Sequence, residues 1–222
     1  MTAAADSPVD TPLAEAFALG PFATNCYIVH LGHGAEGWLV DASFDPSPMI
    51  ERVRRLELRI SRILLTHAHG DHIAGLDDLR RAFPGVPVSG HQDERAFFDN
   101  PSLNLSIDFD PPVRTSPPDE YFKGGEELSL GTSRWKVIHT PGHSPGGVAF
   151  HCATARTAIV GDTLFAGSVG RSDFPTSDEG ALRRSLRTLC ALPDETRILP
   201  GHGPATTIGR EKMFNPYVRK SL

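Results

Sequence analysis

The stretch HAHGDH, at positions 67–72, concentrates three imidazoles and one carboxylate within six residues: His67, His69, Asp71 and His72. Divalent metal ions that prefer nitrogen and oxygen ligands bind such a set, and the absence of cysteine from it argues against a thiolate-type structural zinc site. In an extended segment, the i, i+2 spacing points both His67 and His69 to one side. Asp71 and His72, entering a predicted helix, can face a second point nearby. One short segment can therefore contribute to two adjacent metal positions.

Three further residues of the same chemical types follow short apolar runs later in the chain. His143 lies in HTPGHSPGG, Asp162 in VGDTLF and His202 in LPGHGP. Each follows a predicted strand, and a rigid sheet can gather residues at its strand ends into one pocket. We therefore expect these three residues to join the 67–72 cluster as metal ligands.

The remaining histidines lack this context, and we expect them not to bind metal: His30, His33, His91, His139 and His151. Of these, His91 and His139 are candidates for orienting a metal-bound imidazole, because such rings usually need a hydrogen-bonding partner. Asp41 ends another predicted strand. We expect its carboxylate to accept hydrogen bonds from the metal-binding loop.

Hydrophobic patterning predicts the elements that must position these residues. Short β-branched or leucine-rich runs, stopped by Gly, Pro or small polar residues, indicate buried strands at 38–40, 60–65, 135–138, 157–160 and 197–199. Apolar residues at helical spacing predict helices over 48–56, 73–83 and 179–192, and Asp71 lies where an N-cap or first-turn acid favours the second helix. Strands mixed with helices indicate an α/β or α+β layered domain.

A segment rich in Pro, Asp and Ser, at 99–125, is expected to cross the surface as a long loop. Loops of this length in compact domains are often functional lids or rims of binding sites.

Length and composition favour one globular domain. The chain has 222 residues, which suits a single domain over 13–222 preceded by a flexible tail over 1–12. The net charge of −5 argues against a nucleic-acid-binding surface. No apolar run approaches the roughly 20 residues that cross a bilayer.

The cellular location is predicted from the N-terminus and the cysteines. The first residues have neither a basic region nor an apolar run, so we expect no signal peptide. Cys26, Cys152 and Cys190 are an odd number with no close pair, which favours free buried thiols in a reducing cytoplasm.

The ordered set of His and Asp residues resembles the signature of the metallo-β-lactamase superfamily, HxHxDH followed by isolated His, Asp and His. The resemblance extends over about residues 17–204 and implies an α/β fold, an αββα sandwich of two mixed sheets with helices on the outer faces. It also implies a first metal held by His67, His69 and His143, a second held by Asp71, His72 and His202, and a bridging Asp162.

Within the superfamily, the chain is similar to single-domain glyoxalase-II-like hydrolases, also called hydroxyacylglutathione hydrolase-like. The stretches FATNCYIV, HTPGHSPGG, GDTLFAGSVGRSDFP, LPGHGP and REKMFNPYV carry this similarity. It implies a small-molecule thioester substrate of the S-lactoylglutathione type, cleaved by a hydroxide that bridges two divalent ions. Zinc is the first choice of metal, with iron or manganese as alternatives.

Four residues are expected to serve this reaction beyond holding metal. Asp71 is the candidate catalytic residue, orienting the hydroxide or handling its proton. Arg171 is expected to meet a substrate carboxylate with its bidentate guanidinium, although a structural pairing with Asp173 is an equal alternative. Phe165 and Phe174 are expected to wall the pocket.

A second reading of the same motifs is a mononuclear iron persulfide dioxygenase. That family shares the fold, and its GR-T/S-D-F segment resembles residues 170–174. It would use a facial triad of His67, His143 and Asp162. A non-catalytic metal-binding module is disfavoured, because none of the seven ligand positions is lost. The thiol carrier, the acyl group, the native metal and the oligomeric state are left open.

Overall fold

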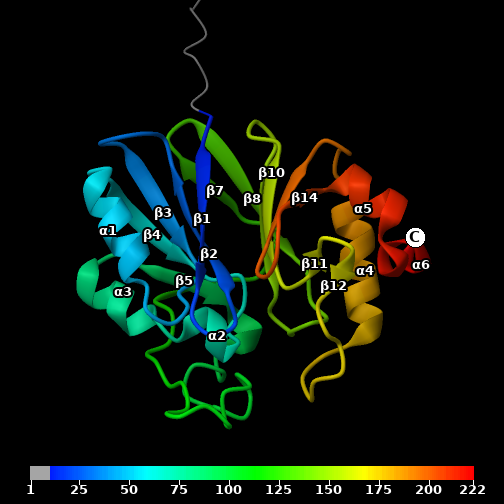
Figure 1. Cartoon of the computed structure of the whole chain (residues 1–222), viewed down its shortest axis with the longest axis horizontal. Helices are drawn as coiled ribbons and strands as arrows, with labels where there is room; N and C mark the ends of the chain where they lie inside the picture. The colour runs from blue at the N-terminus through cyan, green and yellow to red at the C-terminus, as the bar shows by residue number, and fades with distance from the viewer. Residues whose placement is uncertain (1–10) are drawn as a thin grey trace, which may run out of the picture.

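Two β-sheets pack face to face, with helices covering both outer faces (Figure 1). The computed structural model describes residues 11–222. The helices α1 (Ser47–Arg55) and α3 (Leu76–Ala82) lie on one side of the paired sheets, and α4 (Glu179–Cys190), α5 (Ile208–Phe214) and α6 (Pro216–Ser221) lie on the other (Figure 1). This arrangement confirms the predicted αββα sandwich.

The first sheet places the 67–72 segment at one of its edges. Its strand order is β1 (Leu13–Leu19), β2 (Thr24–His30), β3 (Glu36–Val40), β4 (Arg59–Leu64), β5 (Val88–His91) and β6 (Glu120–Phe122). The first three strands are antiparallel, whereas β3 to β6 run parallel. Because parallel strands end at the same edge of a sheet, the residues that follow β3 and β4 emerge together.

The second sheet delivers the other predicted ligands in the same way. Its strand order is β14 (Thr206–Thr207), β13 (Arg197–Pro200), β10 (Thr157–Gly161), β9 (Val148–Cys152), β8 (Ser133–His139) and β7 (Glu127–Leu130). Strands β10 and β13 are parallel, and β9 runs antiparallel to both β8 and β10. Strands β8, β10 and β13 therefore point the same way, and the segments that follow them meet at one edge.

Alternation of buried side chains explains how each sheet supports two apolar layers. Four side chains of β2 and β3 face the second sheet: Tyr27, Val29, Trp38 and Val40. The alternate side chains Cys26, Ile28 and Leu39 face α1 and α3. Period-two alternation puts successive side chains on opposite faces. Trp38 and Trp135 meet edge to face between the sheets, with ring centroids 6.0 Å apart. A third apolar layer joins the second sheet to α4, α5 and α6.

The helix predicted over 73–83 is interrupted in the structure. A short helix α2 (Gly70–Ile73) comes first, and α3 begins only at Leu76. The Gly75 amide donates to the Ala42 carbonyl, and a Cβ on Gly75 would lie 2.2 Å from the Ser43 carbonyl oxygen. This close approach of a neighbouring loop divides the helix, and Asp71 lies in the first turn of the separate α2.

The other predicted elements are found at nearly the predicted positions. Helices α1 and α4 and the five predicted strands are present. The predicted loop over 99–125 ends earlier than expected, because β6 occupies Glu120–Phe122. The three cysteines are buried and free. The tail expected over 1–12 lies mostly outside the described residues. Within 11–222, no helix is long and apolar enough to span a membrane.

Candidate metal centre

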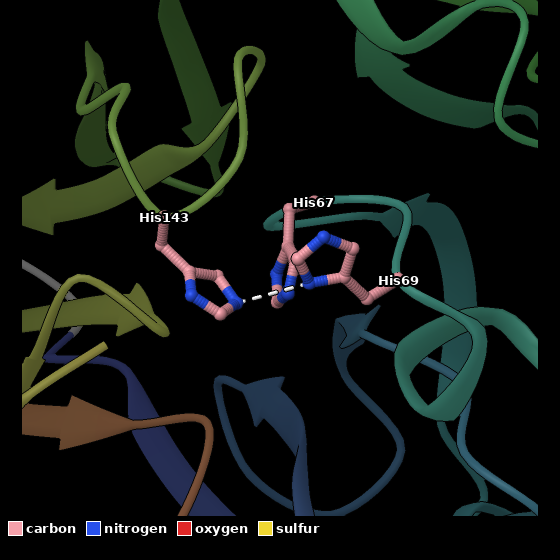
Figure 2. A group of neighbouring side chains, drawn as sticks. All are labelled: His67, His69 and His143. Carbon is pink, nitrogen blue, oxygen red and sulfur yellow. Dashed lines mark hydrogen bonds between the residues drawn. The ribbon is translucent and has the colours of Figure 1, made fainter. Parts of the chain in front are cut away.

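Three imidazoles converge where the two sheet edges face one another. His67 and His69 follow β4, and His143 follows β8. Their ring nitrogens can be chosen so that all lie within 4.8 Å of one another. Figure 2 shows the His69 ring directed at His143, with 2.9 Å between His69 Nδ1 and His143 Nε2. All three rings are buried, so together they form a preorganised nitrogen site.

A second group of ligand atoms lies beside the first. His202 Nε2 is 3.2 Å from Asp71 Oδ2, and His72 Nε2 is 3.6 Å from the same oxygen. Asp162 lies between the two groups. One of its oxygens is 3.4 Å from His72 Nε2, and the other is 3.5 Å from His143 Nε2 and 3.4 Å from His202 Nε2. The structure thus brings together all seven residues that the sequence predicts as ligands.

Hydrogen bonds on the outer side of several rings determine which nitrogen faces inward. His143 Nδ1 donates to the Arg171 carbonyl at 2.8 Å, and His202 Nδ1 donates to the Phe22 carbonyl at 3.2 Å. A carbonyl can only accept, so the proton of each neutral ring lies on Nδ1 and the Nε2 lone pair faces the cluster. This tautomer is the one that a metal ligand requires.

Asp41 performs the same function for His72. Its Oδ2 accepts from His72 Nδ1 at 2.9 Å and from the Thr66 hydroxyl at 2.7 Å, while its Oδ1 accepts from the Thr66 amide at 2.7 Å. Asp41 has a φ of 61°, in the left-handed region, and is 1% exposed. The predicted contact between Asp41 and the metal-binding loop is therefore present.

The inward-facing atoms fit metal ions because several of them are buried without a hydrogen bond. Among the described residues, His67 Nε2, His72 Nε2 and Asp162 Oδ1 are buried and make no hydrogen bond. Buried polar atoms normally find a partner, because an unsatisfied group costs about 1–3 kcal/mol. Nitrogen lone pairs and carboxylate oxygens left unpaired in this way are suitable ligands for divalent ions such as zinc, iron or manganese.

Electrostatics in the cluster divide the rings into two types. Burial lowers the pKa of His67 and His143, and it lowers the pKa of His69 to about 3, so these rings are neutral at pH 7. For His202, burial opposes protonation, but the hydrogen-bonded carboxylates of Asp162 and Asp71 outweigh it and raise the pKa to about 9. The carboxylates therefore create a field that favours a positive charge at the second group.

The sequence matches the metallo-beta-lactamase superfamily over residues 19–202, a range that contains all seven clustered residues. The chain belongs to this superfamily. A protein named "probable metallo-hydrolase" from Streptococcus pyogenes is 38% identical over 81% of this chain and 79% of its own length. The hydroxyacylglutathione hydrolase GloC of Haemophilus influenzae is 36% identical over 81% of this chain and 86% of its own length.

Solved structures of the metallo-beta-lactamase fold superimpose closely on the chain. The BLEG-1 B3 metallo-beta-lactamase has a TM-score of 0.87 and 36% identity, covering 93% of this chain and 99% of that one. TTHA1623 in a di-iron-bound form has a TM-score of 0.78 and 35% identity, covering 91% and 99%. ETHE1 from Myxococcus xanthus has a TM-score of 0.73 and 25% identity, covering 94% and 85%.

In this chain, a cavity of about 440 Å³ opens onto the candidate metal centre. It is bounded by ligand residues on one side and by four phenylalanines, Phe22, Phe109, Phe165 and Phe174. The sequence predicts Phe165 and Phe174 at the pocket but not the other two. Phe109 and Asn104 come from the long segment between β5 and β6, which the sequence predicts to be a surface loop.

Arg171 lines the same cavity, but its guanidinium is already paired. Its Nε and Nη2 donate to Asp173 at 2.9 and 3.0 Å, and its Cζ lies 4.4 Å from the centroid of the Phe174 ring. Both the Arg171 and Asp173 side chains are exposed. The pairing of Arg171 with Asp173, which the sequence offers as the alternative to substrate binding, is therefore present. The Arg171 carbonyl also accepts a hydrogen bond from His143.

Two residues at this superfamily site were not found from the sequence. Thr24, on β2, donates its hydroxyl to Asp71 Oδ2 at 2.7 Å. Glu94, 1% exposed, accepts from the Ala68 amide at 2.6 Å and from the Gly146 amide at 3.0 Å, and burial raises its pKa to about 7. It thereby ties the segment that carries His67 and His69 to the segment that carries His143. A lone acid after a short strand gives no sequence signal for this role.

His91 and His139, the other histidines considered for orienting a ligand, stack on one another instead. Their ring centroids are 4.2 Å apart and nearly parallel, and His139 Nε2 lies 2.9 Å from the Pro145 carbonyl. The pair packs behind the glycine-rich segment after His143, where a Cβ on Gly146 would lie 2.9 Å from His91 Cβ. The His91 and His139 rings therefore pack against the segment after His143, and neither of them orients an imidazole of the metal centre.

Proposed function

We propose that the chain is a metal-dependent thioester hydrolase of the glyoxalase II type, acting on a substrate such as S-lactoylglutathione. The observation that carries this proposal is the placement of Asp162 between two ligand groups that open onto one cavity. Two divalent ions held there would supply a hydroxide near neutral pH and polarise the substrate carbonyl. The relative GloC, a hydroxyacylglutathione hydrolase, supports this choice of substrate class.

The residues around the ions would fix the geometry of the reaction. His67, His69 and His143 would hold one ion, and Asp71, His72 and His202 the other, with Asp162 between them. His72, His143 and His202 are already held by hydrogen bonds on their outer side. These rings would lose little conformational freedom on binding an ion, so the site is preorganised. The ligand residues, which come from four segments, are close enough together that two ions held there would both reach one substrate carbonyl.

Asp71 is suited to orienting the attacking group. Burial favours its neutral form, but His72, His202 and the Thr24 hydroxyl outweigh this effect and lower its pKa to about 2. The carboxylate is therefore ionised at neutral pH and accepts hydrogen bonds. Its role is to hold a donor in place, since so weak a base takes up a proton poorly.

The phenylalanine-lined wall of the cavity suits the acyl group and the sulfur of a thioester. Apolar walls with a few polar groups at one end are typical of small-molecule sites, and a cavity of this size lies within their range of roughly 300–1,000 Å³. The three free, buried cysteines support a reducing compartment such as the cytoplasm.

A second candidate is the iron persulfide dioxygenase that uses one ion. His67, His143 and Asp162 would be its ligand triad: His143 Nε2 is 3.5 Å from Asp162, and the His67 and His143 ring centroids are 5.1 Å apart. Residues of Gly170–Phe174 also line the cavity. Because both candidates share the ligands, the number of ions bound and the reaction supported must distinguish them.

The test combines metal analysis with two assays on protein purified without added metal or chelator. We expect about two zinc, iron or manganese ions per chain and hydrolysis of S-lactoylglutathione, which is lost in Asp162→Ala. One iron per chain, with oxygen consumed in the presence of glutathione persulfide and no thioester hydrolysis, would replace the hydrolase with the dioxygenase.

A further inference from the structure

The stretch FATNCYIV, residues 22–29, contains no predicted metal ligand, yet it contacts two ligands of the second group. It forms the turn before β2 and most of that strand. The Thr24 hydroxyl donates to Asp71, and the Phe22 carbonyl accepts from His202 Nδ1. Within residues 11–222, no hydrogen bond joins this stretch to the three imidazoles of the first group. The stretch therefore holds one half of the metal centre and not the other.

Asn25, buried on β2, holds the turn that carries His202. Its side-chain Nδ2 donates to the Pro200 carbonyl at 3.0 Å and to the Gly203 carbonyl at 2.8 Å. Both hydrogens of the amide group are thus used, one on each side of His202. The Asn25 main-chain amide also donates to the Gly201 carbonyl at 2.7 Å. Because β2 belongs to the first sheet and the turn follows β13 of the second, Asn25 joins the two sheets behind this ligand.

The turn over residues 200–203, which we call the His202 turn, lies directly against other ligands. A Cβ on Gly201 would be 2.0 Å from Asp162 Oδ1 and 2.8 Å from His72 Cε1. The main chain of the turn therefore packs closely on both of these side chains. A small movement of the turn would change the position of His202 relative to them.

We propose that Asn25 is a positioning residue for His202, and that its two side-chain hydrogen bonds set the affinity of the second ion but not that of the first. The inference rests on the two-ion site of the proposed function. A ligand binds well only when its lone pair is held toward the ion, and groups that hold ligands in this way typically contribute about 10–100-fold to metal affinity. Asn25 acts in this way through the main chain of the His202 turn.

The first test is the zinc affinity of Asn25→Ala, which removes both side-chain donors and keeps the main-chain bond to Gly201. Competition with a chromophoric chelator measures the two zinc dissociation constants. We expect one constant to rise about tenfold and the other to change less than about threefold. The constant that rises should be the one that is also affected in His202→Ala. Equal changes at both positions, or a change at neither, would overturn the proposal.

The matched control is Asn215→Ala, at another buried asparagine that does not contact a ligand. The Asn215 side-chain Nδ2 donates to the Ser168 carbonyl at 2.9 Å and to Glu211 Oε2 at 2.8 Å. Its loss removes the same buried donor group and should leave both zinc dissociation constants within about twofold, since distant sites act independently. If Asn215→Ala weakens the same ion position as much as Asn25→Ala does, the effect is general destabilisation and the proposal is wrong.

A milder variant keeps the test valid if Asn25→Ala does not fold. In Asn25→Ser the hydroxyl has one hydrogen to donate where the asparagine amide has two. We expect the second ion to be bound about threefold more weakly, with the first ion unaffected. An unchanged affinity for the second ion in Asn25→Ser would then overturn the proposal.

Hydrogen exchange separates failure of this inference from failure of the proposed function. The Gly201 amide donates to the Gly161 carbonyl at 2.8 Å, so its exchange rate reports the order of the His202 turn without metal or substrate. In metal-free Asn25→Ala we expect this amide to exchange about tenfold faster than in the wild-type protein, and Asn215→Ala should match the wild type.

The two measurements together decide between the outcomes. Wild-type protein that binds one ion, but shows the Asn25-dependent exchange, would overturn the two-ion hydrolase and retain Asn25 as the residue that positions His202. Two bound ions, with no Asn25-dependent change in zinc affinity or in exchange, would retain the hydrolase and overturn the positioning role.

Discussion

Three imidazoles of the metal centre, His72, His143 and His202, are oriented by the group that holds the outer nitrogen of the ring. His143 and His202 donate to main-chain carbonyls, whereas His72 is held by the carboxylate of Asp41. A carboxylate makes the ring more basic and a better ligand than a carbonyl does, and such outer partners strongly affect metal affinity. The three residues behind the ligands therefore contribute to the strength of the site without touching an ion.

Asp41→Asn tests this contribution without disturbing the backbone. Asparagine adopts the left-handed φ that Asp41 has, but its side chain offers one acceptor oxygen instead of two. We expect zinc affinity at the position held by His72 to fall about 10- to 100-fold, as measured by competition with a chromophoric chelator. The control is Asp45→Asn, at an exposed aspartate that also has a positive φ, and it should not change the affinity. Equal affinities in all three proteins would contradict the role given to Asp41.

The raised pKa of His202 predicts that protons are released when metal binds. Between pH 7 and pH 9 the metal-free ring is protonated, because the carboxylates of Asp162 and Asp71 raise its pKa to about 9. A ligand must be neutral, so binding expels this proton, and the apparent affinity should rise with pH until about pH 9.

Calorimetric titration of zinc in two buffers of different ionisation enthalpy measures the number of protons released. At pH 7.5 we expect His202→Asn to release about one proton fewer than the wild-type protein. The same number of protons in both would contradict protonation of His202 in the metal-free protein.

At the scale of elements, the strands and two long helices could be predicted because their signals are local. The apolar runs before Asp41, His67 and Asp162 all proved to be strands. The break between α2 and α3 could not be predicted, since it comes from contact between Gly75 and the distant Ser43 loop. Glu94 was missed for the same reason, because its partners lie 26 and 52 residues away.

Glu94 joins two ligand-bearing segments, and Glu94→Gln tests this link. A glutamine oxygen can accept from the Ala68 or the Gly146 amide, but its NH₂ group faces the other amide as a second donor. One buried amide is then unsatisfied, at a cost of about 1–3 kcal/mol. We expect zinc bound by His67, His69 and His143 to dissociate about tenfold more readily, as measured by the rate of transfer to a chelator. Asp93→Asn, at the adjacent exposed acid, is the control and should match the wild-type protein. A rate unchanged in Glu94→Gln would show that the link does not position the site.

At the scale of the molecule, the metal centre lies where the two halves of the sandwich meet. The segment 67–72 follows a strand of the first sheet, while His143, Asp162 and His202 follow strands of the second. The seven ligand residues could be predicted, because their motifs are short and specific and each follows a strand. The cavity wall could be predicted only in part, since Phe22 and Asn104 reach it through chain folding that no local pattern encodes.

Because the ligands come from both sheets, bound ions should stabilise the whole fold. Ions that bind the folded chain alone at 1,000 times their dissociation constant add about 4 kcal/mol to the free energy of unfolding. For a chain of this length that corresponds to a rise in Tm of about 8–16 °C. We expect a chelator to lower the Tm of the purified protein by this amount, as measured by circular dichroism, and zinc to restore it. Asp162→Ala, which lacks the residue between both ligand groups, should have a Tm close to that of the chelated protein and respond little to zinc. A wild-type Tm that is independent of metal would mean that ions bind without joining the two halves of the fold.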